Sequence, residues 1–193
     1  IDYRITTTAP TTLQVTNGIC FNLSGDMHRS ILKQHLWIDT HYTNKLDKEQ
    51  FPTNELQKTR LTPFDFTQPR EIGERIKATI NGYYHAFQLR HPDNMQKPAA
   101  ILFDAQSGRA MTIYSSEPTL LVNTHGAQSS GITLQPLHAG YNSGMEKVDN
   151  SLQPGQVFHG ATVFLFTTDP PLIMKTKYEQ LEKTLITFKI LGC

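Results

Sequence analysis

Short apolar runs that alternate with polar residues dominate the chain. Ile1, Tyr3 and Ile5 fall on one face of a predicted β-strand, which the Ala9-Pro10 pair ends. Similar runs, rich in β-branched and aromatic residues, predict strands at 13–20, 35–40, 85–89, 99–104, 109–115, 119–123, 131–134 and 157–167. Regularly spaced short strands with few helices predict an all-β, sandwich-like architecture.

Two segments between the predicted strands carry no strand signal. Residues 44–59 are polar, contain a proline and show no convincing period, so they predict no regular element. Residues 61–73 contain two prolines, which exclude a regular helix. We expect this second segment to be an ordered loop held in place by two aromatic residues, Phe64 and Phe66.

Three residues of the last predicted strand, 157–167, are assigned to the core: Phe158, Val163 and Phe164.

Helical spacing appears in two places. Three isoleucines four residues apart predict one or two helical turns over 71–80: Ile72, Ile76 and Ile80. Near the C-terminus, apolar residues spaced three, four and three apart form a stripe: Tyr178, Leu181, Leu185 and Phe188. We therefore divide the chain into a sandwich over 1–168 and a helical extension over 169–193. The stripe of the extension either packs on its own domain, as amphipathic helices generally do, or docks on another protein subunit.

Length and charge limit the possible classes of protein. The chain has 193 residues, enough for one domain with a sizeable core or for part of a larger one. Its formal net charge is +1, and its basic and acidic residues are interspersed along the chain. The sequence therefore shows no basic cluster of the kind that binds nucleic acid. No apolar run is long enough for a transmembrane segment, and no signal peptide is visible, which is compatible with an intracellular protein. The strand-like start suggests a fragment or a processed product.

The sequence shows no sign of a metal or cofactor site. The two cysteines, Cys20 and Cys193, lie at opposite ends of the chain and predict reduced thiols rather than a disulfide framework or a zinc site. The histidines show no metal-ligand spacing with cysteines or carboxylates. No glycine-rich phosphate loop follows a predicted strand. We therefore expect neither a metal nor a cofactor.

One stretch carries a specific resemblance. Residues 15–25 read Val-Thr-Asn-Gly-Ile-Cys-Phe-Asn-Leu-Ser-Gly. This run resembles the Thr-Asn-His-x-x-Phe-Asn-Leu-x-Gly motif of the aldose 1-epimerase (galactose mutarotase) family. Further landmarks similar to those of the family follow in the same order: Thr62-Pro63-Phe64-Asp65-Phe66, Gly82-Tyr83-Tyr84-His85, Ser107-Gly108-Arg109 and Ser116-Glu117-Pro118.

The resemblance covers about residues 1–167 and corresponds to the C-terminal portion of a family domain nearly twice this length. It implies a large antiparallel β-sandwich, the galactose mutarotase-like supersandwich, here only partial. In that fold the sugar site lies on the concave face of one sheet.

The same resemblance implies that the catalytic positions are substituted. Mutarotation needs an acid for the ring oxygen and a base for the anomeric hydroxyl. The position of the family's acid, a histidine, is Gly18, and the position of its base, a glutamate, is Gln135. An amide cannot accept a proton at useful pH. Tyr84 replaces an aspartate that binds sugar hydroxyls, and Leu121 replaces a sugar-contacting glutamine. Each change removes a polar group or fills space in the site.

Three hypotheses follow for the function. The preferred one is a catalytically inactive pseudoenzyme that serves as a structural or interaction subunit, because a fold can persist after its site is lost. The second is an active aldose 1-epimerase or a related sugar epimerase that acts on hexoses. A pair such as His85 and His138 could supply substitute acid–base chemistry. The third is a non-catalytic carbohydrate-binding module, in which Tyr84 and Trp37 could stack on a sugar.

These hypotheses assign a small set of residues and partners. The candidate sugar-cleft residues are Asn17, Tyr84, His85, Gln135 and His138, and the candidate ligand is a hexose. A protein partner could bind the C-terminal stripe, or a companion chain could supply the missing half of the domain.

Overall fold

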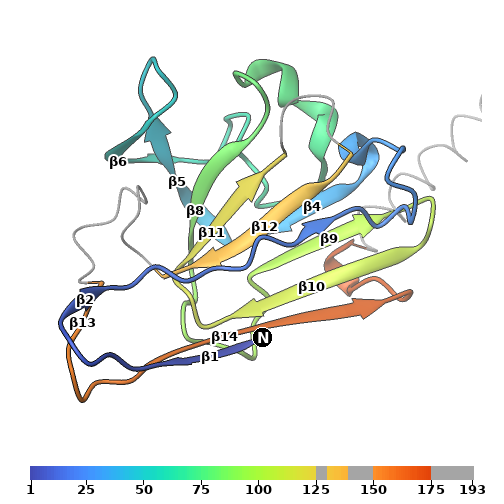
Figure 1. The fold of residues 1–193 in the computed structure, drawn as a ribbon. Coiled ribbons are helices and arrows are strands. Elements are labelled where there is room, and N and C mark those ends of the chain that lie inside the picture. The colour runs from blue at the N-terminus through green and yellow to red at the C-terminus, as the bar shows by residue number, and fades with distance from the viewer. Residues whose placement is uncertain (125–129, 139–149, 175–193) are drawn as a thin grey trace, which may run out of the picture.

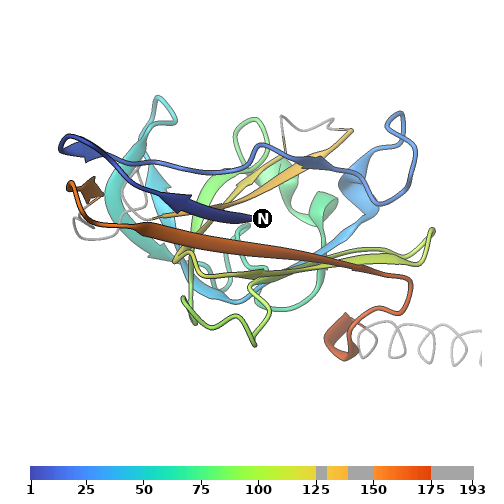
Figure 2. The ribbon, with the colours of Figure 1, turned by 60° about the horizontal axis from the view of Figure 1, so that its bottom comes forward.

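The computed structural model describes residues 1–124, 130–138 and 150–174, which fold into two facing β-sheets (Figures 1 and 2). The first sheet has six strands in the order β1 (Asp2–Ile5), β14 (Phe158–Thr167), β10 (Arg109–Ser115), β9 (Ala100–Asp104), β4 (His35–Ile38) and β7 (Arg70–Glu71). The second has the order β3 (Cys20–Phe21), β12 (Ile132–Leu137), β11 (Thr119–Asn123), β8 (Tyr84–Leu89), β5 (Thr40–Leu46) and β6 (Pro52–Lys58). A separate pair joins β2 (Thr11–Thr12) and β13 (Ser151–Leu152). All strand pairings among these residues are antiparallel, so the predicted all-β sandwich is confirmed.

The core lies between the two six-stranded sheets. Each sheet contributes alternate side chains to it, as the two-residue period of a strand requires. Fully buried members from the two sheets include Leu36, Leu102, Met111, Ile113, Phe87, Leu120, Val122 and Leu134. A second, smaller cluster on the first sheet contains Ile101, Phe103, Ala110 and Met174. The alternation fixes which side chains of the second sheet face away from the core.

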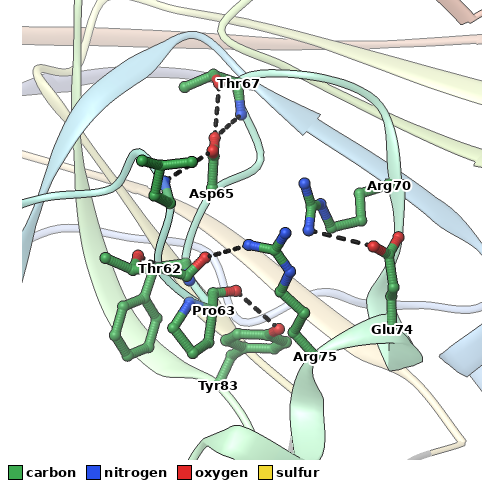
Figure 3. A network of polar contacts seen from close by, with 10 residues as sticks. Thr62, Pro63, Asp65, Thr67, Arg70, Glu74, Arg75 and Tyr83 are labelled. Carbon is green, nitrogen blue, oxygen red and sulfur yellow. Dashed lines mark hydrogen bonds and ion pairs between the residues drawn. The ribbon is translucent and has the colours of Figure 1, made fainter.

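The loop over residues 61–73 is ordered, as predicted, and Figure 3 shows the polar contacts that hold it. Arg75 Nη1 donates to the Thr62 carbonyl at 2.9 Å, and the Tyr83 hydroxyl donates to the Pro63 carbonyl at 3.1 Å. Burial raises the pKa of Tyr83 to about 12, so the hydroxyl keeps its proton and remains a donor. Phe66 is fully buried between Tyr83 and Phe87.

Asp65 sits at the centre of the same loop. Its carboxylate accepts hydrogen bonds from the Thr67 hydroxyl at 2.6 Å and from the Thr67 and Leu61 amides at 3.2 Å each (Figure 3). Burial alone would raise the pKa of Asp65, but these hydrogen bonds outweigh it and the pKa is lowered. The Thr62–Phe66 motif is therefore a structural support whose two phenylalanines pack against the second sheet.

The structure confirms most of the predicted strands. The bounds predicted for 109–115 and 119–123 coincide with β10 and β11, and those for the other strands after residue 84 agree within three residues. Two short 3₁₀ turns, Ile72–Glu74 and Ile76–Ala78, occupy the segment where helical turns were predicted.

Several details of the prediction are wrong. Residues 44–59, which predicted no regular element, contain the end of β5 and the whole of β6, and these two strands pair as a hairpin. Residues 13–20 are not one strand, because only Cys20 belongs to a strand in this stretch. Val163 was assigned to the core, but it is 47 % exposed.

The residues of the predicted C-terminal stripe, Tyr178, Leu181, Leu185 and Phe188, lie outside the described residues, as does Cys193. Among the described residues, no helix has the length and hydropathy needed to cross a membrane.

Candidate functional site

The candidate site is a pocket on the face of the second sheet that is turned away from the core. Strand registry brings Leu121 of β11 opposite Ala86 of β8 on one side and Gln135 of β12 on the other. The pocket beside them has a volume of about 180 Å³ and is lined by Asn44, Gln50, Phe51, Pro52, Tyr84, Ala86, Leu121 and Leu137. This volume is smaller than the ~300–1,000 Å³ typical of ligand pockets.

The β5–β6 hairpin forms one wall of the pocket. Asp47 accepts hydrogen bonds from the Glu49 and Phe51 amides at 3.0 and 2.8 Å, and Gln50 adopts a positive φ of 67°. The tight turn that results carries Gln50 and Phe51 to the pocket. At the base of the hairpin, Asn44 Oδ1 accepts from the Ala86 amide at 2.9 Å, which fixes the hairpin to β8.

Gly18 and Gln135 are neighbours beside this pocket. A Cβ atom built on Gly18 would lie 3.8 Å from Gln135 Nε2. Gln135 Nε2 donates to the Asn17 carbonyl at 2.8 Å, and the Thr16 hydroxyl donates to the Pro136 carbonyl at 3.2 Å. These two bonds dock the segment that carries Gly18 onto β12. The buried Oδ1 of Asn17 accepts no hydrogen bond from the residues that the structure describes.

Tyr84 lies at the start of β8 and lines the pocket with a side chain that is 49 % exposed. Its cross-strand partner is Asn123 of β11. The ring therefore occupies space at the pocket.

His85 belongs to the core. It follows Tyr84 in β8, so it points to the opposite face of the sheet, where it is buried against the ring of Phe64 with the centroids 4.2 Å apart. Burial disfavours the charged imidazolium and lowers the pKa of His85 to about 4. This neutral side chain does not face the pocket on the outer side of the sheet.

His138 follows the end of β12 and contacts Glu117 and Phe158. Its Nδ1 lies 3.1 Å from Glu117 Oε2, and its ring meets the edge of Phe158 at a centroid distance of 5.0 Å. Burial raises the pKa of Glu117, and the nearby imidazole partly offsets that effect.

His85 and His138 are not brought together. Val122 lies opposite both His85 and Leu134, and Leu134 is four residues before His138 on the neighbouring strand. Four strand residues span about 13 Å. The two imidazoles therefore cannot act as acid and base on one small substrate.

Trp37 and the hairpin residues differ in their relation to the pocket. Trp37 lies in the first sheet, where its indole nitrogen donates to the Thr67 carbonyl at 3.1 Å, so it is far from the pocket wall. The hairpin residues of the pocket were not predicted, because their polar segment showed no period. Among the described residues, no group of three or more His, Cys, Asp or Glu side chains could hold a metal ion.

Comparison with known proteins identifies similar chains. The family model for aldose 1-epimerase matches residues 1–164. A galactose mutarotase of Sus scrofa is 25 % identical over 183 residues, with 86 % of this chain and 53 % of the relative covered. An aldose 1-epimerase of Escherichia coli K12 is 29 % identical over 126 residues, with 62 % of this chain and 36 % of the relative covered. The chain thus spans about half the length, or less, of the curated relatives it matches.

Solved structures share the fold. An aldose epimerase homologue from C. elegans superposes with a TM-score of 0.76 at 18 % identity, covering 88 % of this chain and 55 % of that one. A galactose 1-epimerase from Lactobacillus acidophilus superposes with a TM-score of 0.72 at 18 % identity, covering 86 % of this chain and 52 % of that one. The galactose mutarotase-like sandwich predicted from the sequence is confirmed.

Proposed function

Because the chain belongs to the aldose 1-epimerase family, we propose that it is a catalytically inactive member whose sandwich serves as a structural or interaction subunit. The proposal concerns the chemistry of one pair of positions, Gly18 and Gln135. Both correspond, by the resemblance of their motifs, to the acid and the base of mutarotation.

The contact between these two positions is the observation that carries the proposal. The separation of 3.8 Å between a Cβ at position 18 and Gln135 Nε2 means that both family positions border the same small space. Glycine has no side chain to donate a proton, and the Gln135 amide is already committed as a donor to Asn17. Loss of one oriented acid or base costs about 10² to 10⁴ in rate, so loss of both leaves little catalysis.

The lining of the pocket supports the same conclusion. Among the residues that the structure describes, those that line the pocket carry no carboxylate, imidazole or amine. The two histidines that could replace the lost groups lie apart, with His85 in the core and His138 paired with Glu117.

Polarimetry of freshly dissolved α-galactose and α-glucose tests this proposal. We expect the optical rotation to relax at the same rate with the protein as in buffer alone. Acceleration well above buffer that disappears in a Gln135→Leu variant would overturn the proposal and favour an active epimerase. The variant is needed because a contaminating mutarotase would be unaffected by it.

A non-catalytic carbohydrate-binding role is the second candidate. It is favoured by the exposed rings of Tyr84 and Phe51 at the pocket. Aromatic faces and amide groups are the usual means of holding a small polar ligand in a cleft. Calorimetric titration with galactose would show heat that a Tyr84→Ala variant loses, and no heat in either protein would exclude this role.

A further inference from the structure

Half of β14 forms an open edge of the first sheet. β1 pairs with β14 only over Phe158–Ala161, whereas β10 pairs with β14 over Thr162–Thr167. In Figure 2, β1 lies beside one half of β14, and no other described strand lies along the same side of the second half. Within 1–124, 130–138 and 150–174, no strand pairs with this edge of residues 163–167.

The backbone of this half-strand presents hydrogen-bonding groups at the open edge. The Thr162 amide donates to the Ile1 carbonyl at 2.9 Å, so residue 162 directs its backbone groups toward the β1 side. Alternate residues of an antiparallel strand share this direction. The N–H and C=O groups of Phe164 and Phe166 therefore point to the open edge. An exposed row of this kind is a template for pairing with another strand.

The side chains at the edge are apolar on both faces. Phe164 and Phe166 lie opposite Ile113 and Met111, so they point into the space between the sheets. Phe166 is nevertheless 57 % exposed, although its ring lies 6.2 Å from that of Phe21 on the other sheet. On the outer face, Val163 and Leu165 are 47 % and 51 % exposed. An interior-facing aromatic ring that is mostly exposed marks a core that is not closed at this edge.

We propose that this edge pairs with β14 of a second copy of the chain, antiparallel, about a two-fold axis at Leu165. In this register Phe164 of one copy lies opposite Phe166 of the other, and these are the residues whose backbone groups point outward. Each copy then gains backbone hydrogen bonds at both residues, and the aromatic pairs cover each other on the inner face. Leu165 lies opposite Leu165 of the second copy on the outer face.

Charge favours a second copy as the occupant. Residues 160–168 contain no charged side chain, and the whole chain has a formal net charge of only +1. Two copies can therefore approach along this strand without like-charge repulsion. The absence of lysine, proline or other edge-blocking residues distinguishes β14 from edges that are protected against pairing. The interface is self-complementary, as a two-fold dimer requires, and it does not depend on the catalytic state of the pocket.

Sedimentation equilibrium of the 193-residue chain tests the association. We expect a concentration-dependent rise toward twice the 21.8 kDa mass of one chain. Leu165→Lys and Leu165→Glu each place like charges opposite one another at the axis, and should each raise the dimer dissociation constant by about tenfold or more. An equimolar mixture of these two variants should recover the dimer, because opposite charges then meet. Leu172→Lys, at an exposed leucine outside β14, is the matched control and should leave association unchanged.

The results of these experiments distinguish a second copy of the chain from other partners of the β14 edge. A wild-type chain that stays monomeric at all concentrations would overturn the proposal and leave the edge to strands from another part of a family-length domain. Assemblies larger than a dimer, or variants that the mixture does not rescue, would show unspecific edge association and would also overturn it. Hydrogen exchange provides a readout without mutation: the Phe164 and Phe166 amides should become protected as the concentration rises. Unchanged exchange would contradict the pairing even if every Leu165 variant failed to fold.

Discussion

Gln135 donates its side-chain amide to the carbonyl oxygen of Asn17 at 2.8 Å. This bond spans two segments that are far apart in the sequence and holds the Gly18 segment against β12. The amide therefore has a structural role at the position that the motif resemblance assigns to the family's base. A carboxylate in the same place would meet the Asn17 carbonyl oxygen, acceptor against acceptor.

Replacing this amide by a carboxylate should make stability depend on pH. In Gln135→Glu the ionised group repels the Asn17 carbonyl, whereas the protonated group can still donate to it, so the folded-state pKa of the new carboxyl is raised. Its stabilising contact is then present at low pH and is lost as pH rises. We expect a loss of about 1–3 kcal/mol in unfolding free energy near neutral pH.

Urea unfolding of the wild type and Gln135→Glu at pH 7 and pH 4 measures this effect. Gln135→Leu is the control, because it leaves the Asn17 carbonyl unpaired at every pH and should show a loss that does not change with pH. An equal stability difference from wild type at both pH values for Gln135→Glu would contradict the account.

Burial of His85 should weaken the fold in acid. The folded-state pKa of about 4 lies below the ordinary value of 6.5, so the unfolded chain binds more protons between these values. The contribution of His85 to the unfolding free energy is therefore fully present above about pH 6.5. It falls by on the order of 2–3 kcal/mol as the pH drops toward 4.

His85→Phe removes the titrating group and keeps a ring against Phe64. Its unfolding free energy should fall less than that of wild type between pH 7 and pH 4.5. His28→Gln, at an exposed histidine, should keep the wild-type dependence. If His85→Phe showed the same acid sensitivity as wild type, the buried neutral histidine could not be its source.

Two glycines should respond differently to an added methyl group. A Cβ at Gly160 would clash with Glu117 Oε1, whose carboxylate is buried and paired with His138. Among the described residues, a Cβ at Gly18 meets only Gln135 Nε2, at an ordinary 3.8 Å. We expect Gly160→Ala to cost about 1–3 kcal/mol and Gly18→Ala to change stability by less than about 1 kcal/mol. Thermal unfolding of both variants checks this difference, and equal losses would contradict it.

The sequence predicts the parts of the fold in which burial sets the pattern. β10 and β11 have alternating or continuous apolar residues that the core demands, and their predicted bounds coincide with the observed ones. The β5–β6 hairpin escapes prediction because both of its faces carry polar residues, such as Thr43 and Asn44, whose burial depends on contacts with β8. The segment 13–20 reads as a strand, yet side-chain bonds to β12 replace part of the regular ladder.

The site is predictable only in part, for a related reason. The order of motifs assigns Gly18, Tyr84 and Gln135 to one site, and the structure brings Gly18 next to Gln135. Period-two alternation implies that Tyr84 and His85 point to opposite faces, but only the packing of Phe64 decides which of them is buried. The wall formed by Gln50 and Phe51 follows from a turn geometry that composition does not reveal.

The most direct test of the central claim is the dependence of the α-galactose mutarotation rate on protein concentration, measured by polarimetry. The proposed inactive family member, in which the motif resemblance assigns Gly18 and Gln135 to the two catalytic positions, predicts a slope of zero for the wild type. A positive slope that Gln135→Leu abolishes would contradict the claim, because it would place working acid–base chemistry at this site.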